Sequence, residues 1–267
     1  MRALHVVTGG SRGIGLALCA ELLARQPAGI IVAASRKGSD ALSALASAHP
    51  DRVHFAQCDV TQPESVAELG QRCASIAKSS GDGDTTLRLL VNTAGVLHTS
   101  PPPEAPAGGA AKPAKREGRM PERSLADIDA EWMRETLAVN AIGPVLVTQA
   151  LRPMLGKGSV VANLSARVGS IGDNRLGGWW SYRMSKAALN MATRNTALEL
   201  GRRGVTAVSL HPGTTATDLS APFSRNVKPE KLFTPEFTAR SLLDVVDGLG
   251  PEDNGGFFAY DGTPIEW

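Results

Sequence analysis

Residues 8–15 read TGGSRGIG and join a short apolar run, Ala3–Thr8, to the helical run LALCAELLAR at residues 16–25. Glycines at these spacings allow a tight turn from strand to helix, and they let backbone N–H groups approach a phosphate at the start of the helix. A glycine repeat also occurs in turns that bind no ligand, but its position after the first strand of an α/β series favours dinucleotide binding. The residues that we expect to contact such a cofactor are Gly9, Ser11, Arg12, Gly13, Ile14 and Gly15.

Beyond this turn the chain alternates between short apolar runs and segments with helical periodicity. Most of the apolar runs are continuous, as expected for strands of a parallel sheet that is covered by helices on both faces. The pattern predicts one α/β domain, residues 1–267, with a doubly wound, mostly parallel seven-stranded sheet. The predicted strands are Ala3–Thr8, Gly29–Ser35, Val53–Gln57, Leu87–Asn92, Ser159–Leu164, Val205–Leu210 and Gly256–Ala259. The predicted helices are Gly13–Arg25, Asp40–Ala48, Pro63–Lys78, Asp129–Leu155, Tyr182–Gly201 and Pro235–Leu249.

The length and composition also fit a single globular domain. The chain has 267 residues, of which 42% are hydrophobic and 20% charged, so it can bury a core without disulfides and is neither fibrous nor disordered. A net charge of +2 gives little reason to expect nucleic acid or an anionic membrane as the main partner. Three cysteines without C-x-x-C spacing indicate reduced structural thiols, and no metal site is predicted. The chain has no secretory signal pattern and no apolar stretch of membrane-span length, so we expect a cytoplasmic location.

One segment, residues 98–123, interrupts the alternation. It reads HTSPPPEAPAGGAAKPAKREGRMPER and is nearly free of large apolar side chains, so we expect a flexible surface insertion that adds little to the core. Its basic residues could instead form a nucleic-acid-binding patch, which would predict strongly salt-dependent binding. No aromatic residues are interleaved among them, so we favour a solvated loop. The basic residues are Lys112, Lys115, Arg116, Arg119 and Arg123.

The end of the second strand indicates which dinucleotide is bound. About twenty residues after the glycine turn, an acid would hydrogen-bond the adenosine ribose of NAD, but this chain has Ser35, Arg36 and Lys37 there. A carboxylate would repel a 2′-phosphate, whereas a guanidinium can hold it with paired hydrogen bonds. Arg12 in the glycine turn adds a second cation. We therefore predict NADP(H), with contacts from Ser35 and Arg36; the alternative is that Arg36 is a solvated loop residue.

A tyrosine and a lysine four residues apart, Tyr182 and Lys186, lie in the stretch SYRMSK at residues 181–186. On a helix this spacing places both side chains on one face, where their polar ends can meet. The same spacing is common on surface helices as a half-buried ring beside a solvated amine, so the pair alone does not identify a site.

Taken together, the motifs resemble those of the short-chain dehydrogenase/reductases over essentially the whole chain. They follow in order as the glycine turn, Asp59-Val60 after the third strand, Asn92-Thr93-Ala94-Gly95 after the fourth, Asn140, Ser165, the Tyr182–Lys186 pair and Pro212-Gly213. Thr93 replaces the second Asn of the family's NNAG motif, which is a conservative change. The resemblance implies a Rossmann fold and a catalytic set of Asn140, Ser165, Tyr182 and Lys186. It also implies cofactor contacts from Asp59, Val60, Asn92, Ala94, Gly95, Tyr182, Lys186, Pro212, Gly213 and Thr215.

A departure from the usual pattern points to a branch of this family. Ser165 and Tyr182 are seventeen residues apart, longer than usual, and the added piece is GDNRLGGWW at residues 172–180. With the run HPGTTATDLSAPF at residues 211–223 and the ending GGFFAYDGTPIEW, this insertion resembles the C-factor or Sniffer-type carbonyl reductases. That branch implies an NADPH-dependent reductase of carbonyl compounds whose substrate the resemblance does not specify.

The roles of the catalytic residues follow from the chemistry of carbonyl reduction, which needs a hydride on carbon and a proton on the developing alkoxide. Tyr182 can donate the proton, and a nearby Lys186 ammonium would lower the pKa of its phenol from about 10. Ser165 would hold the carbonyl oxygen. The resemblance implies that Lys186 also bonds the nicotinamide ribose and that Asn140 holds a water linking Lys186 to solvent.

Two further expectations concern the protein as a whole. The main alternative is a non-catalytic NADP-binding sensor or signalling protein on the same fold, because fold does not decide function. Such a protein would be free to lose Tyr182 or Ser165, and this chain keeps both, so we favour an enzyme. The resemblance also implies a homodimer or homotetramer. Trp179, Trp180, Phe223 and Phe233 either make the substrate pocket apolar or pack in the core or an interface.

Overall fold

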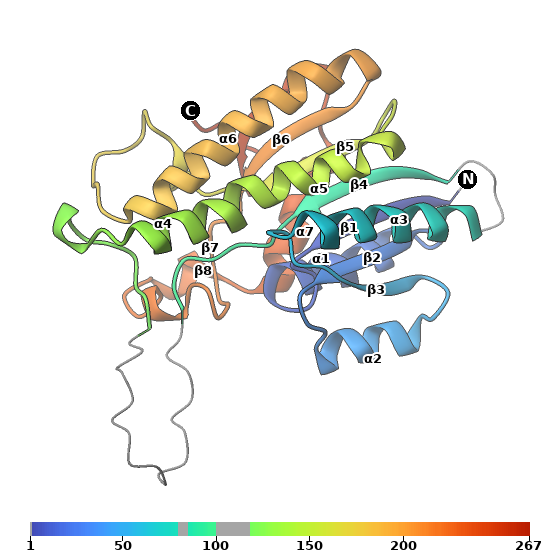
Figure 1. Ribbon diagram of the computed structural model, residues 1–267, viewed down its shortest axis with the longest axis horizontal. Coiled ribbons are helices and arrows are strands. Elements are labelled where there is room, and N and C mark those ends of the chain that lie inside the picture. The colour runs from blue at the N-terminus through green and yellow to red at the C-terminus, as the bar shows by residue number, and fades with distance from the viewer. Residues whose placement is uncertain (1, 80–84, 100–117) are drawn as a thin grey trace, which may run out of the picture.

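A seven-stranded parallel sheet forms the centre of the computed structural model, which describes residues 2–79, 85–99 and 118–267 (Figure 1). Its strand order is β3-β2-β1-β4-β5-β6-β9. The chain runs outward from β1 to β3, returns to β4 beside β1, and then runs outward on the other side. The carboxyl ends of β1 and β4 are therefore the switch point at which ligands bind in such sheets. The strands are β1 Ala3–Thr8, β2 Ile30–Ser35, β3 Val53–Gln57, β4 Thr86–Asn92, β5 Val160–Leu164, β6 Thr206–His211 and β9 Phe257–Ala259.

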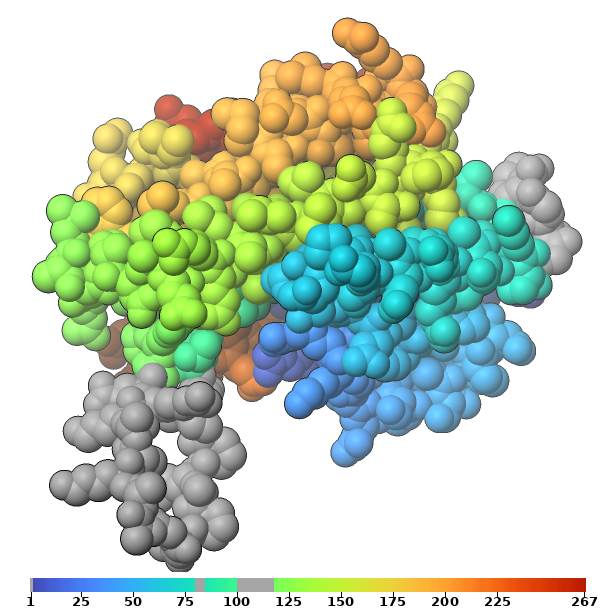
Figure 2. All heavy atoms as spheres, viewed as in Figure 1, coloured from blue at the N-terminus to red at the C-terminus, as the bar shows by residue number. Residues whose placement is uncertain are grey.

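Helices cover both faces of this sheet, as predicted (Figure 1). One face carries α3, α5 and α6, whose side chains form a continuous cover in the space-filling view (Figure 2). The other face packs against α1, α2 and α7. The helices are α1 Gly13–Arg25, α2 Asp40–Ala48, α3 Pro63–Ser79, α4 Ala130–Leu137, α5 Gly143–Leu151, α6 Trp180–Leu200 and α7 Pro235–Asp247.

The continuous apolar strands divide their side chains between these two faces. In β2, Ile30 and Val32 belong to the core on the α3–α5–α6 face, whereas Ile31 and Ala33 pack on the α1–α7 face. Successive side chains of a strand point to opposite faces, so a strand buried on both faces has to be apolar throughout. The predicted fold class, a single doubly wound α/β domain, is confirmed.

Two local features differ from the predicted elements. The helix expected over Asp129–Leu155 is divided by a π-helical turn at Ala138–Ile142 and ends in a 3₁₀ turn at Arg152–Met154. A single turn with i→i+5 hydrogen bonds often marks a functional position, and Asn140 lies in the middle of this one. A second, two-stranded sheet, β7 Thr214–Thr215 with β8 Leu232–Phe233, was not predicted because its strands are too short to show periodicity.

The predicted insertion, residues 98–123, lies largely outside the described residues, and only its two ends are described. These ends are held together, since the Thr99 N–H donates to the Arg119 carbonyl at 2.9 Å and the Arg119 N–H donates to the Thr99 hydroxyl at 2.9 Å. Glu122 is only 3% exposed. The expectation of a solvated surface segment is therefore wrong at this end, where a carboxylate is buried against α6.

The remaining general expectations can be compared with the described part of the chain. Cys19, Cys58 and Cys73 are buried and unpaired, as expected of structural thiols. Within residues 2–79, 85–99 and 118–267, no helix is long and apolar enough to cross a membrane. Those same residues contain no group of three or more His, Cys, Asp or Glu side chains placed to hold a metal ion. The cytoplasmic location stays a prediction.

Candidate active site

The glycine turn joins β1 to α1 at the switch point of the sheet. Gly9 has φ of 69°, and a Cβ there would lie 2.9 Å from the Ala94 amide nitrogen, so only glycine fits beside the β4 loop. A Cβ on Gly15 would collide with the Gly9 carbonyl oxygen. Arg12 is the N-cap residue of α1 and makes no side-chain capping bond. The first N–H groups of α1 are thus not capped by the residue before them, as an anion-binding turn requires.

Arg12, the second cation predicted to meet the 2′-phosphate, is paired with a carboxylate in this structure. Its Nη1 lies 2.8 Å from an Asp218 oxygen, and both side chains are largely exposed (73% and 78%). Asp218 belongs to the segment between β7 and β8, and Thr217 of the same segment would contact a Cβ on Gly13 at 3.2 Å. This segment therefore borders the glycine turn.

The end of β2 borders a cavity of about 380 Å³ lined by Arg36, Gln57, Asp59, Ser65 and Glu68. Arg36 and Asp59, predicted from the sequence to bind the adenosine end, thus line one space. Partial burial raises the pKa of the Asp59 carboxyl, but bonds from the Thr61 N–H and hydroxyl and the charge of Arg36 outweigh it and leave this pKa below its usual range. Ser35 is engaged locally, since its hydroxyl donates to the Lys37 carbonyl at 2.8 Å.

The loop after β4 is joined to β1 by its threonine. The Thr93 hydroxyl donates to the Thr8 carbonyl at 2.5 Å, which explains how the chain tolerates threonine in place of the family's second asparagine. Ala94 and Gly95 follow beside Gly9, and a Cβ on Gly95 would lie 3.4 Å from the Asn140 Oδ1 atom and 3.9 Å from the Lys186 amine. The loop predicted to contact the cofactor therefore passes next to the predicted catalytic residues.

Asn92, the last residue of β4, has a buried side chain. It is 2% exposed, and its amide donates to the Asn163 Oδ1 atom at 2.9 Å. Asn163 donates in turn to Thr193 on α6, at 2.9 Å. The Asn92 side chain thus belongs to a buried polar network that joins β4, β5 and α6, and the cofactor contact of this residue stays a prediction. A fully bonded network of this kind fixes the relative position of its elements.

One face of α6 carries the central residues of the site. Tyr182, Lys186 and Asn190 follow at intervals of four residues, so they share this face, and all three are buried. The Lys186 amine donates to the carbonyl of Leu164, the last residue of β5, at 2.7 Å. It also lies 5.6 Å from the centre of the Tyr182 ring. The tyrosine and lysine predicted to act together therefore do meet at the carboxyl end of β5.

Ser165 directly follows Leu164 and reaches the same face of α6. Its hydroxyl donates to the Asn190 Oδ1 atom at 2.7 Å. Sequence reasoning missed Asn190, although its position eight residues after Tyr182 is the signal that would have found it. Asn190 fixes the orientation of Ser165, whose single hydroxyl hydrogen is used in this bond.

Asn140 is fully buried and joins the β4 loop to α6. The Val96 N–H donates to its Oδ1 atom at 2.8 Å, and its amide donates to the Val96 carbonyl at 2.8 Å and to the Ser185 hydroxyl at 3.0 Å. Ser185 donates to the Tyr182 carbonyl at 2.8 Å. Both amide hydrogens of Asn140 are therefore used, so the role implied by the resemblance, holding a water, would fall to another of its atoms.

Burial decides the pKa values of the two central groups. It raises the pKa of the Tyr182 phenol well above its usual range and lowers the pKa of Lys186 to about 8. The direction for Tyr182 is opposite to the one expected from the sequence, which assumed that the lysine charge would dominate. The physical reason is that the phenolate would lose its hydration in this enclosed position.

Aromatic side chains from three segments gather beside Tyr182. The Trp179 ring lies edge-on to Tyr182 at 6.2 Å between centroids and 4.9 Å from Phe223, which in turn contacts His98 at 5.9 Å. Trp179 has φ of 51°, the only positive value among the non-glycine residues that the structure describes. Bulky residues rarely adopt this conformation, and such strain is typical of functional positions. Of the four aromatic residues singled out, Trp179 and Phe223 thus lie beside Tyr182. Phe233 packs on Phe237 and Tyr260 and lies next to Gly213, and Trp180 is 37% exposed.

The turn after β6 brings the last predicted cofactor residues to the same end of the sheet. Gly213 follows Pro212 with φ of 71°. The Thr215 side chain is 3% exposed and bonds the Thr238 hydroxyl of α7 at 2.8 Å, and its contact with the cofactor stays a prediction. Burial lowers the pKa of His211, the last residue of β6, to about 4.

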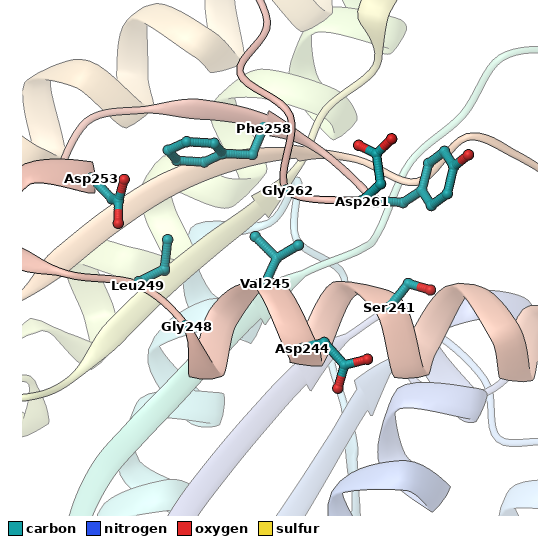
Figure 3. Close-up of a pocket in the computed structure, with 10 residues that line it drawn as sticks. Ser241, Asp244, Val245, Gly248, Leu249, Asp253, Phe258, Asp261 and Gly262 are labelled. Carbon is teal, nitrogen blue, oxygen red and sulfur yellow. The ribbon is translucent and has the colours of Figure 1, made fainter.

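Another cavity lies elsewhere, between the end of α7 and the β9 region, and measures about 430 Å³ (Figure 3). Its lining includes none of the predicted site residues. Its three aspartates already have partners, since Asp244 pairs with Arg25, Asp253 accepts from the Gly250 N–H and Asp261 accepts from Thr263. In Figure 3, Asp244 also points away from the cavity. These carboxylates stabilise the fold rather than form a site.

The sequence and the fold of this chain are both similar to those of known proteins. The family model described as short chain dehydrogenase matches residues 4–228. The chain is 42% identical to the C-signal protein of Myxococcus xanthus over 146 residues, which cover 54% of this chain and 84% of that protein.

Two solved structures share the whole fold. The carbonyl reductase from chicken fatty liver, solved with NADPH bound, superposes with a TM-score of 0.81 at 28% identity, covering 100% of both chains. The carbonyl reductase Sniffer of D. melanogaster gives 0.80 at 26% identity, again over 100% of both chains. The chain therefore belongs to the short-chain dehydrogenase/reductase family of oxidoreductases, in the branch that contains C-signal and Sniffer.

Proposed function

We propose that this protein is an NADPH-dependent reductase of carbonyl compounds, with Tyr182 as the proton donor. The observation that carries the proposal is the convergence of Tyr182 and Lys186 on one face of α6 with the carboxyl end of β5, from which Ser165 projects. A phenol, an amine and a hydroxyl meet there beside the loop that borders the glycine turn.

The residues of this chain offer partners for the pyrophosphate and for the 2′-phosphate of the cofactor. The uncapped start of α1 would hold the pyrophosphate, and Gly9, Ser11, Gly13, Ile14 and Gly15 would form the turn around it. Arg36 would hold the 2′-phosphate, with Arg12 as a second cation once it leaves Asp218. The carbonyl reductase with NADPH bound supports this choice. Asp59 and Glu68 line the same cavity, so the preference for NADPH over NADH rests on the guanidinium groups.

The bound nicotinamide would supply the hydride, and the residues of this chain would supply the proton and the orientation. A phenol is protonated at neutral pH, and burial, which raises the pKa of Tyr182, favours this form further, so the proton is present when the alkoxide forms beside it. Ser165 would hold the carbonyl oxygen by turning its hydroxyl from Asn190 to the substrate. The Lys186 ammonium would stabilise the phenolate left on Tyr182, since it lies against that ring.

The experiment that tests this function is NADPH oxidation with a panel of ketones, aldehydes and quinones, using Tyr182→Phe as the comparison. The Phe variant keeps the ring but has no transferable proton, so we expect turnover to fall by about 10²-fold or more while NADPH affinity stays within about twofold. Tyr182 is not the acid if this variant keeps a near-normal rate on a substrate that the native enzyme reduces.

A second candidate is a non-catalytic NADP-binding sensor or signalling protein on the same fold. The similarity to the protein named C-signal favours it. This candidate predicts tight NADPH binding with no turnover on any carbonyl compound of the panel. The retention of Tyr182, Lys186 and Ser165 in a bonded arrangement supports the enzyme instead.

We further propose that the protein is a homodimer or homotetramer. Apolar side chains are exposed along α5 and α6 and at the π-helical turn, as an interface between copies requires. Light scattering of the purified protein would give the number of subunits. These side chains are Ile142, Val145, Met184, Met191 and Leu198.

A further inference from the structure

Glu122 is a buried carboxylate that none of the expected roles uses. It lies at the described end of the 98–123 segment and is 3% exposed. One of its carboxylate oxygens accepts the N–H of Ser181 at 3.1 Å, and the other accepts the Ser181 hydroxyl, which is itself fully buried. Its backbone carbonyl accepts the N–H of Trp179 at 2.5 Å. Glu122 thus bonds the residues on either side of Trp180, the first residue of α6.

The start of α6 needs such a partner. Trp179 is the N-cap residue, but its side chain carries no acceptor and its backbone has the left-handed conformation. The N–H groups of a first helical turn have no partner within the helix and are usually bonded by a Ser, Thr, Asp or Asn side chain at the N-cap. Here the acceptor comes from a segment 59 residues away in sequence. Its negative charge is also favourable at the N-terminus of a 21-residue helix.

The position of this bond matters because Tyr182 is the next residue. Trp179, which precedes Trp180 and Ser181, also packs edge-on against the Tyr182 ring. Loss of the carboxylate would leave the buried N–H and the buried hydroxyl of Ser181 without these partners, whereas the Trp179 N–H would keep its bond to the backbone carbonyl of residue 122. The first turn of α6 would then move together with its phenol.

We propose that Glu122 is a positioning residue for the proton donor: by capping the first turn of α6 from outside the helix, it holds the Tyr182 phenol in register with Lys186 and Ser165. The catalytic part of this inference rests on the proposed function, whereas the capping part does not. Misplacement of a reacting group by about 1 Å can cost on the order of 10²-fold in rate, so a cap at this point has a large effect on turnover.

The test compares Glu122→Ala with Glu122→Gln, using Glu135→Ala as the control. Glutamine can accept the Ser181 N–H and donate to the Ser181 hydroxyl, so we expect it to keep kcat within about threefold of the native value. Alanine can do neither, and we expect kcat to fall roughly tenfold or more, with the Kd for NADPH within about threefold. Glu135 carries the same charge on α4 but is exposed. Its loss should therefore leave unchanged kcat, the Kd for NADPH and the amide hydrogen exchange of α6.

If Glu122 only stabilised the fold, Glu122→Ala would lower the free energy of unfolding and leave kcat unchanged. The folded fraction would turn over normally at temperatures far below unfolding. Equal kcat in the Ala variant and the native protein would therefore overturn the proposal. So would a Gln variant as slow as the Ala variant, because that result would assign the effect to charge rather than position.

Amide hydrogen exchange gives a readout that needs no substrate. We expect exchange of residues 180–186 to become faster in Glu122→Ala and to stay native-like in Glu122→Gln, and unchanged exchange in the Ala variant would refute the capping role. If the Ala variant does not fold, Ser181→Ala decides, since it removes only the hydroxyl bond: faster exchange of the same turn supports the proposal and native-like exchange overturns it. A native protein that reduces nothing on the panel would instead refute the proposed function, and exchange would still test Glu122.

Discussion

Replacing Lys186 with methionine should make the folded protein more stable near neutral pH while removing its activity. Lys186 is 5% exposed, and burial lowers its pKa from the ordinary value of 10.5 to about 8. This lowering corresponds to about 3 kcal/mol of unfavourable free energy for holding the charged amine in the folded state. Methionine fills nearly the same volume without the charge, so this cost disappears.

The gain is partly offset by one lost hydrogen bond. The amine donates to the Leu164 carbonyl at 2.7 Å, and leaving that buried acceptor without a partner costs about 1–3 kcal/mol. We therefore expect a net stabilisation of about 0–2 kcal/mol at pH 7 and a loss of most turnover. A functional group that destabilises the fold in this way is a common consequence of building an active site.

The pH dependence gives the sharper test. The folded-state pKa of Lys186 lies below the unfolded value, so between about pH 8 and 10.5 the unfolded chain binds the additional proton. The stability of the native protein relative to Lys186→Met must then rise with pH across this window. Urea denaturation of both proteins at several pH values from 7 to about 10 measures the difference. A difference that does not change across this range would refute the argument that burial of a charged amine governs the site.

Two further predictions concern the cofactor. Arg36→Asp should weaken NADPH binding by about 10–100-fold and leave NADH binding within about threefold of the native value. The reason is that charge-assisted bonds to a phosphate are worth roughly 1.5–3 kcal/mol. Equal losses of affinity for both cofactors, measured by fluorescence titration, would show that Arg36 does not bind the 2′-phosphate. Asp218→Asn should tighten NADPH binding by about 1.5–5-fold without changing the affinity for NADH. The substitution releases Arg12 from an exposed ion pair that is worth about 0.2–1 kcal/mol. A tightening that is unchanged in high salt would argue against this electrostatic origin.

The sequence was sufficient for the features that depend on local pattern. The strand and helix order follows from the period of the apolar residues, and the parallel sheet follows from strands such as β2 that are apolar at every position. The glycine turn could be located because Gly9 and Gly15 have no room for a Cβ, a requirement that appears in the sequence as glycine. The spacing of Tyr182 and Lys186 likewise placed both on one helical face.

The features that only the tertiary structure decided are contacts between segments far apart in sequence. Nothing near Asn92 indicates that its amide is used by Asn163, and nothing near Arg12 indicates an ion pair with Asp218. The direction of the Tyr182 pKa shift was mispredicted because burial, which a sequence does not give, outweighs the nearby charge. Glu122 was assigned to a solvated loop because its surroundings in sequence are polar, yet α6 buries it. Hydrogen bonds and desolvation depend on which groups meet in space, and it is the fold that brings these groups together.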